Sequence, residues 1–175
     1  TFEVTEKLDG SSMTVFFKDG KMGVCSRNLE LVEDDNNTFW KVAKQGPTPE
    51  GVNPGAILDH AIQGELIGPG IQGNPYGLQE HSVRVFGIWF FDGTYLPPAH
   101  RQSLVGNHPQ KLTHVPVIAN GVKLPETIGE VLAMSDGISA LAHVPREGLV
   151  WKCEQDPSIS FKAISNKWLL KVEKD

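Results

Sequence analysis

The sequence predicts an α+β fold in which antiparallel β-sheets are flanked by helices. Residues 2–6 alternate apolar and polar side chains as a half-buried strand does, and residues 13–17 and 22–25 flank an Asp-Gly pair typical of a hairpin turn. Strand and helix patterns then follow without the regular alternation that a doubly wound parallel sheet requires. We therefore expect antiparallel sheets.

The other elements are predicted from the same kinds of pattern. Further strands are expected over apolar runs bounded by turn residues: 61–67, 83–91, 149–153 and 158–164. Four short helices are expected, three of them opened by an N-cap residue or a proline: 39–43, 98–106, 125–134 and 166–173. The last should place Trp168, Leu169 and Val172 on one side. The glycine- and proline-rich segments 45–55 and 68–77 are expected to be loops.

Length and composition fit one globular domain spanning residues 1–175, with 39% hydrophobic and 21% charged residues. No apolar run approaches the ~18 residues of a membrane span and no signal peptide is recognised, so we expect no membrane partner. Cys25 and Cys153 lack metal-ligand spacing and are expected to be buried free thiols, which favours an intracellular, cytoplasmic location. The net charge of −5 argues against a large surface that follows nucleic-acid phosphates, although lysines gather after residue 150.

A lysine motif, Glu6-Lys7-Leu8-Asp9-Gly10-Ser11, directly follows the first strand. A lysine on such a turn can attack the α-phosphate of a nucleotide and hold AMP or GMP as a phosphoramidate. A lysine amine with a pKa of ~10.4 is protonated at pH 7, so a neighbouring cation or desolvation must favour its neutral form. Taken alone, the motif also fits a surface lysine at an ordinary hairpin tip, where the glycine permits a sharp turn.

Four further blocks follow in a fixed order: Gly64-Glu65-Leu66, Val85-Phe86-Gly87-Ile88, Glu147-Gly148-Leu149-Val150-Trp151-Lys152 and Ser160-Phe161-Lys162. Their order and spacing resemble the covalent nucleotidyltransferase superfamily of polynucleotide ligases and RNA capping enzymes, from about residue 4 to 171. Residues 7–11, 63–74 and 160–166 are most similar to ATP-dependent RNA ligases of the nick-sealing type. The resemblance implies the adenylation (nucleotidyltransferase) domain of these enzymes. Because relatives often carry an N-terminal OB-type domain and this chain has no initiator Met, we expect a fragment of a longer protein.

The resemblance implies three catalytic residues. Lys7 would be the nucleophile, Asp9 would lie near the reacting phosphate and ribose, and Lys162 would contact the α-phosphate and oppose the charge of the transition state. Many relatives have a Lys-x-Lys pair at the last position, whereas only Lys162 is present here. Lys167 is a candidate substitute for the missing lysine.

The resemblance also implies a nucleotide-binding set. Glu6 would border the adenine, although an exposed strand carboxylate is an equal alternative. Arg27 would contact the ribose or the 5′-phosphate of the strand being joined, unless it is an ordinary surface arginine. Glu65 would bind the ribose hydroxyls, and Phe86 would stack on the purine rather than only fill the core. Glu147 would bind Mg²⁺ (or Mn²⁺), an ion held through few carboxylates together with phosphates.

These assignments lead to one expected function and three alternatives. We expect an ATP-dependent RNA ligase that forms lysyl-AMP and seals 5′-phosphate and 3′-hydroxyl ends or nicks in RNA. It should act as a monomer with ATP and a divalent metal ion. The alternatives are a DNA ligase, a GTP-dependent capping guanylyltransferase, and a module that binds nucleotides or nicks without sealing them.

Overall fold

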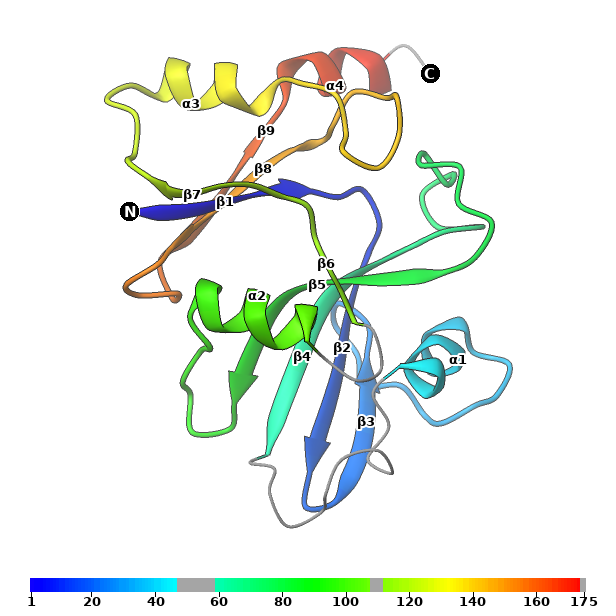
Figure 1. Cartoon of the computed structure of the whole chain (residues 1–175). Helices are drawn as coiled ribbons and strands as arrows, with labels where there is room; N and C mark the ends of the chain where they lie inside the picture. The colour runs from blue at the N-terminus through cyan, green and yellow to red at the C-terminus, as the bar shows by residue number, and fades with distance from the viewer. Residues whose placement is uncertain (47–58, 108–111, 174–175) are drawn as a thin grey trace.

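Two stacked β-sheets form the frame of the protein (Figure 1). The computed structural model describes residues 1–46, 59–107 and 112–173. The upper sheet has the strand order β7-β1-β8-β9 and the lower one the order β3-β2-β4-β5-β6. The pairings between these strands are antiparallel, apart from the short parallel pairing of β5 with β6. The predicted α+β class with antiparallel sheets is confirmed.

The strands are β1 (Phe2–Lys7), β2 (Ser11–Lys18), β3 (Lys21–Cys25), β4 (His60–Ile67), β5 (Ser82–Phe90), β6 (Thr113–His114), β7 (Val117–Val122), β8 (Gly148–Cys153) and β9 (Ser160–Ile164). The helices are α1 (Thr38–Gln45), α2 (Pro98–Gly106), α3 (Ile128–Ser135) and α4 (Asn166–Val172). Helices α3 and α4 lie above the upper sheet (Figure 1). Helices α1 and α2 both pack on the face of the lower sheet that carries Val15, Ile62 and Ile88. None of these helices is long and apolar enough to cross a membrane.

Local signals placed the hairpin and the first helix correctly. Asp19 and Gly20 have φ angles of 50° and 72°, the left-handed values that a tight hairpin turn between β2 and β3 requires. The side chain of Asn37 accepts hydrogen bonds from the backbone N–H groups of Phe39 and Trp40, which caps α1 as predicted.

Other expectations need correction. Helix α3 begins at Ile128 rather than at residue 125, because Thr127 and Glu130 form a reciprocal capping box that fixes the start of the helix. Strands β6 and β7 were not predicted. Strand β6 has only two residues, and the sequence Val-Ile-Ala-Asn-Gly-Val of β7 does not alternate apolar and polar side chains. In α4, Trp168 is half-buried, whereas Leu169 and Val172 are exposed. Most of the predicted loop 45–55 lies outside the described residues, and Gln45 is the last residue of α1.

Each sheet has its own apolar core. On the upper sheet, five buried side chains pack together, with α3 contributing one of them: Val4, Val131, Leu149, Trp151 and Ala163. On the lower sheet, α1 covers a second cluster: Met13, Val15, Val24, Trp40, Ala43 and Leu66. Cys25 and Cys153 are free thiols as predicted, but both are half-buried rather than buried.

Strand β1 is buried on both faces, although its alternation predicted a half-buried strand. Val4 packs into the core beneath the helices, while Glu3 and Thr5 on the opposite side are equally buried. The reason is that this polar side faces the space between the two sheets. An alternating strand therefore supplies both a core face and a polar, enclosed face.

The chain passes from the upper sheet to the lower one immediately after Lys7. Strand β1 ends at Lys7 and β2 begins at Ser11, so only residues 8–10 make the crossing (Figure 1). Leu8 is buried in this crossing. The lysine of the sequence motif is thus held at the junction of the two sheets.

Candidate active site

A cavity of about 370 Å³ lies between the two sheets. Its lining comes from the polar side of β1, from β4 and β5 of the lower sheet, and from β8 and the segment leading into β9. Among the lining residues are Glu3, Thr5, Glu6, Lys7, Gln63, Glu65, Phe86, Val150, Lys152 and Ser160. Four of the residues predicted for nucleotide binding therefore meet in one cavity: Glu6, Lys7, Glu65 and Phe86.

Lys7 forms an ion pair with Glu147, with 2.5 Å between Nζ and Oε1. The pairing follows from strand register, because Lys7 lies opposite Gly148 and Glu147 directly precedes β8. The second carboxylate oxygen of Glu147 is buried and has no hydrogen-bond partner among the described residues. Burial raises the pKa of Glu147, while its hydrogen bond with Lys7 opposes that change. A carboxylate oxygen in this state is available to a ligand or a metal ion.

The position of Glu147 is fixed by neighbours that the sequence did not indicate. Its carbonyl oxygen accepts a hydrogen bond of 2.8 Å from the N–H of Ser165, at the start of α4. The guanidinium of the preceding Arg146 donates to the carbonyl oxygens of Met134 and Asp136, at 2.7 and 2.9 Å. Because those carbonyls lie at the end of α3, Arg146 connects the carboxylate's segment to that helix.

Asp9 and Gly10 complete the turn after the lysine. Burial raises the pKa of Asp9, although the charge of Lys7 opposes the shift. A glycine is needed at position 10 because of a close backbone approach, and not because of the predicted sharp turn. A Cβ at Gly10 would come within 2.4 Å of the carbonyl oxygen of Leu66, so only a glycine lets this turn approach β4 so closely.

Glu65 approaches the lysine from β4. Burial raises the pKa of this carboxyl to about 7, and the charge of Lys7 counteracts part of that effect. The backbone of Gly10 also opposes the rise of this pKa. Glu65 therefore changes its charge near neutral pH, beside both the lysine and its turn.

Phe86 lies at an irregularity of the lower sheet. Gln63 pairs with Gly87 and Gly64 pairs with Val85, so Phe86 is the extra residue of a β-bulge. Its side chain lines the cavity and also packs against a buried cluster near Leu8. The ring therefore borders the cavity, where a stacked base is predicted, and also contacts the core.

Glu6 is buried, so the alternative of an exposed strand carboxylate is wrong. One of its oxygens accepts a hydrogen bond of 2.8 Å from the N–H of Ala140. The other, Oε1, is buried without a partner among the described residues, and Glu6 lines the cavity. This oxygen can accept a hydrogen bond from a ligand.

Lys152 is a cavity residue that the predicted site did not include. Its Nζ donates a hydrogen bond of 3.1 Å to the carbonyl oxygen of Phe86. Burial lowers its pKa to about 8, and the charge of Arg101 acts in the same direction. The sequence carried a usable signal, because Lys152 stands two residues after Val150 and so shares its face of β8.

Five predicted residues do not belong to the lining of this cavity. Asp9 and Glu147 lie beside Lys7, whereas the other three are exposed. Lys162 is exposed on β9 opposite Val150, and its charge acts on Glu147. Arg27 is exposed just after β3. Lys167 is exposed in the first turn of α4, where its backbone N–H, rather than its ammonium, donates to Asp136.

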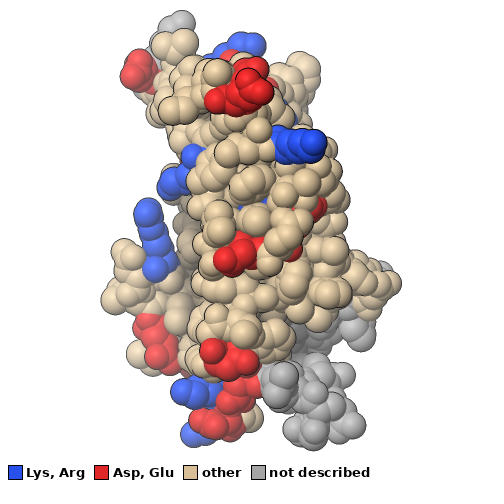
Figure 2. Space-filling view, turned by 90° about the vertical axis from the view of Figure 1, so that its left-hand side faces the viewer, with Lys and Arg blue, Asp and Glu red and all other residues tan. Residues whose placement is uncertain are grey.

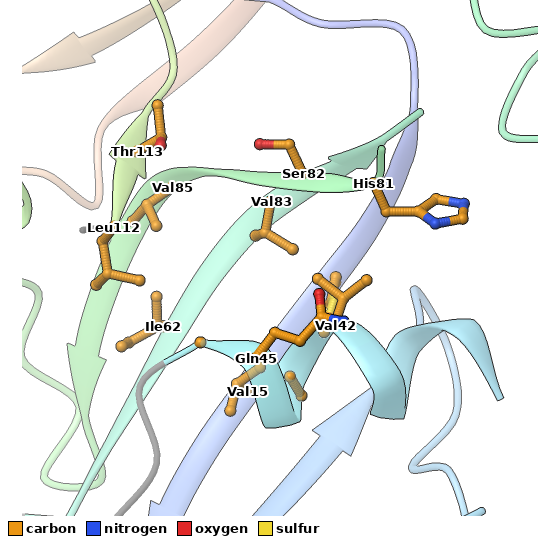
Figure 3. A pocket seen from close by; sticks show the side chains of 13 residues that line it. Val15, Val42, Gln45, Ile62, His81, Ser82, Val83, Val85, Leu112 and Thr113 are labelled. Carbon is orange, nitrogen blue, oxygen red and sulfur yellow. The ribbon is translucent and has the colours of Figure 1, made fainter. Parts of the chain in front are cut away.

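A second cavity, of about 200 Å³, lies between α1 and the lower sheet. Figure 3 shows its mainly aliphatic lining, with side chains such as Val15, Val42 and Ile62 around it and His81 at its edge. The lining holds no carboxylate, lysine or arginine among the described residues. It therefore lacks the charged groups that chemistry on a nucleotide requires, and the cavity between the sheets is the candidate site.

Charged side chains are dispersed over the face shown in Figure 2, where basic and acidic groups form small separate patches. This face carries no continuous basic surface among the described residues. Within the same described part of the chain, no group of three or more His, Cys, Asp or Glu residues could hold a metal ion. A metal ion at Glu147 would thus need ligand atoms from a substrate.

The comparisons with known proteins agree with this geometry. The family described as RNA ligase matches residues 1–168. Among curated proteins, no sequence matches the chain. Three similar solved structures are of Naegleria gruberi RNA ligase: one with pyrophosphate at 44% identity, and variants with ATP and Mn and with AMP and Mn, each at 43%. All three have a TM-score of 0.90 and cover 99% of this chain, which spans 52% of theirs.

Proposed function

Because the chain belongs to the RNA ligase family, we propose that it is the adenylation domain of an ATP-dependent RNA ligase that seals 5′-phosphate and 3′-hydroxyl ends or nicks. The observation that carries the proposal is the placement of Lys7 at the junction of the two sheets. There it faces a cavity of about 370 Å³ and pairs with a carboxylate that has a buried, unpaired oxygen.

The reaction proceeds in three displacements at phosphorus. The Lys7 amine, after giving up a proton, forms a bond to the α-phosphorus of ATP, and the bond to the bridging oxygen breaks to release pyrophosphate. An oxygen of the RNA 5′-phosphate then displaces Lys7 and takes up the AMP. Finally, the RNA 3′-hydroxyl loses its proton and attacks the activated 5′-phosphate, which forms the phosphodiester and releases AMP.

The cavity offers groups that fit adenine. The ring of Phe86 provides an apolar surface for a purine, and the unpaired Oε1 of Glu6 requires a hydrogen-bond donor. The 6-amino group of adenine is such a donor, whereas guanine has a carbonyl oxygen in that position. Guanine has donors of its own, N1–H and the 2-amino group, so Glu6 alone does not separate the two bases. The match to the RNA ligase family and the similar structure with ATP and Mn favour ATP over GTP, and so a ligase over a capping guanylyltransferase.

The remaining predicted residues act on the phosphates and the ribose. Glu65 is placed to accept a hydrogen bond from a ribose hydroxyl, and Asp9 borders the reacting phosphate. Lys162 on β9 is assigned to the α-phosphate, with Lys167 as the candidate second lysine. Arg27 is assigned to the ribose or to the 5′-phosphate of the strand being joined. Their exposure leaves them accessible to an RNA strand.

A divalent metal ion, Mg²⁺ or Mn²⁺, would be held by Glu147 together with phosphate oxygens of the substrate. The free oxygen of that carboxylate fits such an ion. When bound, the ion would neutralise charge on the phosphates. The Naegleria gruberi structures with ATP and Mn support both cofactors.

The proposal extends to the setting of the enzyme. Its partner is RNA, it acts as a monomer in the cytoplasm, and it works within a longer protein that includes an N-terminal OB-type domain. The dispersed surface charge in Figure 2 and the net charge of −5 favour a partner domain that carries part of the RNA contact.

Intact-mass spectrometry tests the first displacement directly. Incubation with ATP and magnesium should add the mass of one AMP, and pyrophosphate should reverse the addition. Lys7→Ala should abolish the adduct and leave the protein folded, because Lys7 belongs to the cavity rather than to the apolar core. Lys21→Ala, which alters an exposed lysine in the hairpin, is the matched control and should react normally.

The other outcomes separate the alternatives. An adduct formed with GTP alone would replace the proposal with a guanylyltransferase. An adduct that persists in Lys7→Ala would refute the assigned nucleophile. Sealing of an all-DNA nick as fast as an RNA nick would indicate a DNA ligase, and ATP binding without any adduct would indicate a non-sealing module.

A further inference from the structure

We propose that Tyr76, in the glycine-rich segment 68–77, is a positioning residue for the nucleophile, because its hydroxyl holds the turn that follows Lys7. This inference rests on the proposed function and extends it to a segment for which the sequence predicted only a loop. The backbone N–H of Asp9 donates a hydrogen bond of 2.7 Å to the Tyr76 hydroxyl oxygen.

The hydroxyl is fixed because the ring that carries it is buried. Tyr76 packs in a cluster with Leu8, Ile67 and Val115, and its exposed fraction is 8%. Leu8 immediately precedes the residue whose N–H is bound. The tyrosine is therefore tied to the crossing between the sheets in two ways: it shares a buried cluster with Leu8, and its hydroxyl accepts a hydrogen bond from Asp9.

The segment that presents Tyr76 is itself held in a defined conformation. Six of its residues have left-handed or otherwise positive φ angles: Gly68, Gly70, Gln72, Gly73, Asn74 and Gly77. Asn74 forms two hydrogen bonds with the backbone of Leu78, at 2.9 and 3.1 Å. Consecutive turns close through further backbone bonds at Ile71, Asn74 and Gly77. A segment with this many internal bonds can act as a rigid support.

The surroundings of the hydroxyl connect it to the reacting groups. Burial raises the pKa of Tyr76, and the charges of Glu6, Asp9 and Glu147 raise it further, so the side chain keeps its proton. A neutral hydroxyl accepts the N–H of Asp9 without adding another negative charge beside Lys7. Since only residues 8–10 connect β1 to β2, a constraint on Asp9 also constrains the backbone that carries the lysine.

Tyr76→Phe tests this role, because it removes the hydroxyl and keeps the ring. Val144→Ala is the matched control, since Val144 packs against the same cluster and its backbone hydrogen bonds join it to Ser139 and Ala142 rather than to the lysine turn. Hydrogen–deuterium exchange should become about tenfold faster at the Asp9 amide in Tyr76→Phe only. This measurement does not depend on ligase activity, so a failure of the proposed function would not obscure it.

The kinetic test follows single-turnover formation of lysyl-AMP. In Tyr76→Phe, the rate at saturating ATP should fall about tenfold while the ATP concentration for half-maximal rate stays within about twofold. Val144→Ala should lower the thermal unfolding temperature and leave the rate of the folded protein unchanged. The inference would be overturned if the Asp9 amide of Tyr76→Phe exchanged at the wild-type rate. It would also be overturned if Tyr76→Phe and Val144→Ala formed lysyl-AMP at equal rates.

Discussion

At the scale of single residues, the cavity concentrates ionisable groups where water is largely excluded. Burial raises the pKa of Asp9, Glu65 and Glu147, while it lowers that of Lys152. Each shift disfavours the charged form, as expected for groups withdrawn from solvent. The arrangement costs stability in the empty protein and leaves unpaired oxygens for a ligand.

Glu65 should make stability depend on pH. Its pKa in the folded chain is about 7, above the ordinary value of 4.5, so the folded state holds the proton more tightly. The resulting stabilisation is fully present below pH 4.5 and is lost as the pH rises through about 7. Glu65→Gln cannot titrate, so its free energy of unfolding should increase relative to wild type across this range.

Urea denaturation of both proteins at pH 5, 6, 7 and 8 would measure that difference. A control variant, Glu33→Gln, alters an exposed carboxyl in the segment before α1, and its stability should keep the wild-type pH dependence. Curves for Glu65→Gln and wild type that run parallel from pH 5 to 8 would contradict the assignment.

At the scale of elements, the ends of helices and strands bring the site together. Helix α3 is fixed at its start by the capping box of Thr127 and Glu130, and at its end by the guanidinium of Arg146. The residue after Arg146 is Glu147, so the helix holds the segment that presents the carboxylate to Lys7. The strand after it, β8, then forms hydrogen bonds with both β1 and β9.

Thr127→Ala should lower the free energy of unfolding by about 1 kcal/mol, because the N–H of Glu130 loses its capping oxygen. Thr127→Ser keeps a hydroxyl and should retain most of that free energy. Chemical denaturation of the two variants gives the comparison. Equal destabilisation by alanine and serine would mean that the threonine methyl group, and not the cap, stabilises α3.

At the scale of the whole molecule, a buried ion pair joins the two halves. Arg101 on α2, which packs against the lower sheet, pairs with Glu3 of β1 in the upper sheet, and both side chains are 1% exposed. Arg101 also donates a hydrogen bond of 3.0 Å to Nε2 of His114. Gln102 donates one of 2.5 Å to the carboxylate of Glu3. This network lies at the cavity wall, because Glu3 is one of its lining residues.

Arg101→Met should lower the free energy of unfolding by about 3–5 kcal/mol, since it leaves the carboxylate of Glu3 buried without its main partner. The double variant Arg101→Met with Glu3→Gln removes that charge and should recover much of the loss. Urea denaturation of the two single variants and the double variant provides the cycle. Strictly additive losses would show that the two residues stabilise the fold independently.

Local features of the fold could be predicted from the amino-acid sequence. The Asp-Gly turn of the hairpin and the Asn37 cap of α1 depend on neighbours within a few residues, so their signals can be read along the chain. The order of the five blocks likewise identified the family, which requires only residue types and spacing. Fold class, helix α2 and most strands followed from the same local information.

The construction of the site could not be predicted in this way, because its contacts join residues far apart in the chain. The pair of Lys7 with Glu147 spans 140 positions, and the bond from Asp9 to Tyr76 spans 67. The bulge at Phe86 depends on the register between two strands. Periodicity along the sequence predicts which face of a strand a side chain occupies. Which faces meet depends on the register between strands and on where the chain passes from one sheet to the other. In this protein both enclose the polar side of β1 around the lysine.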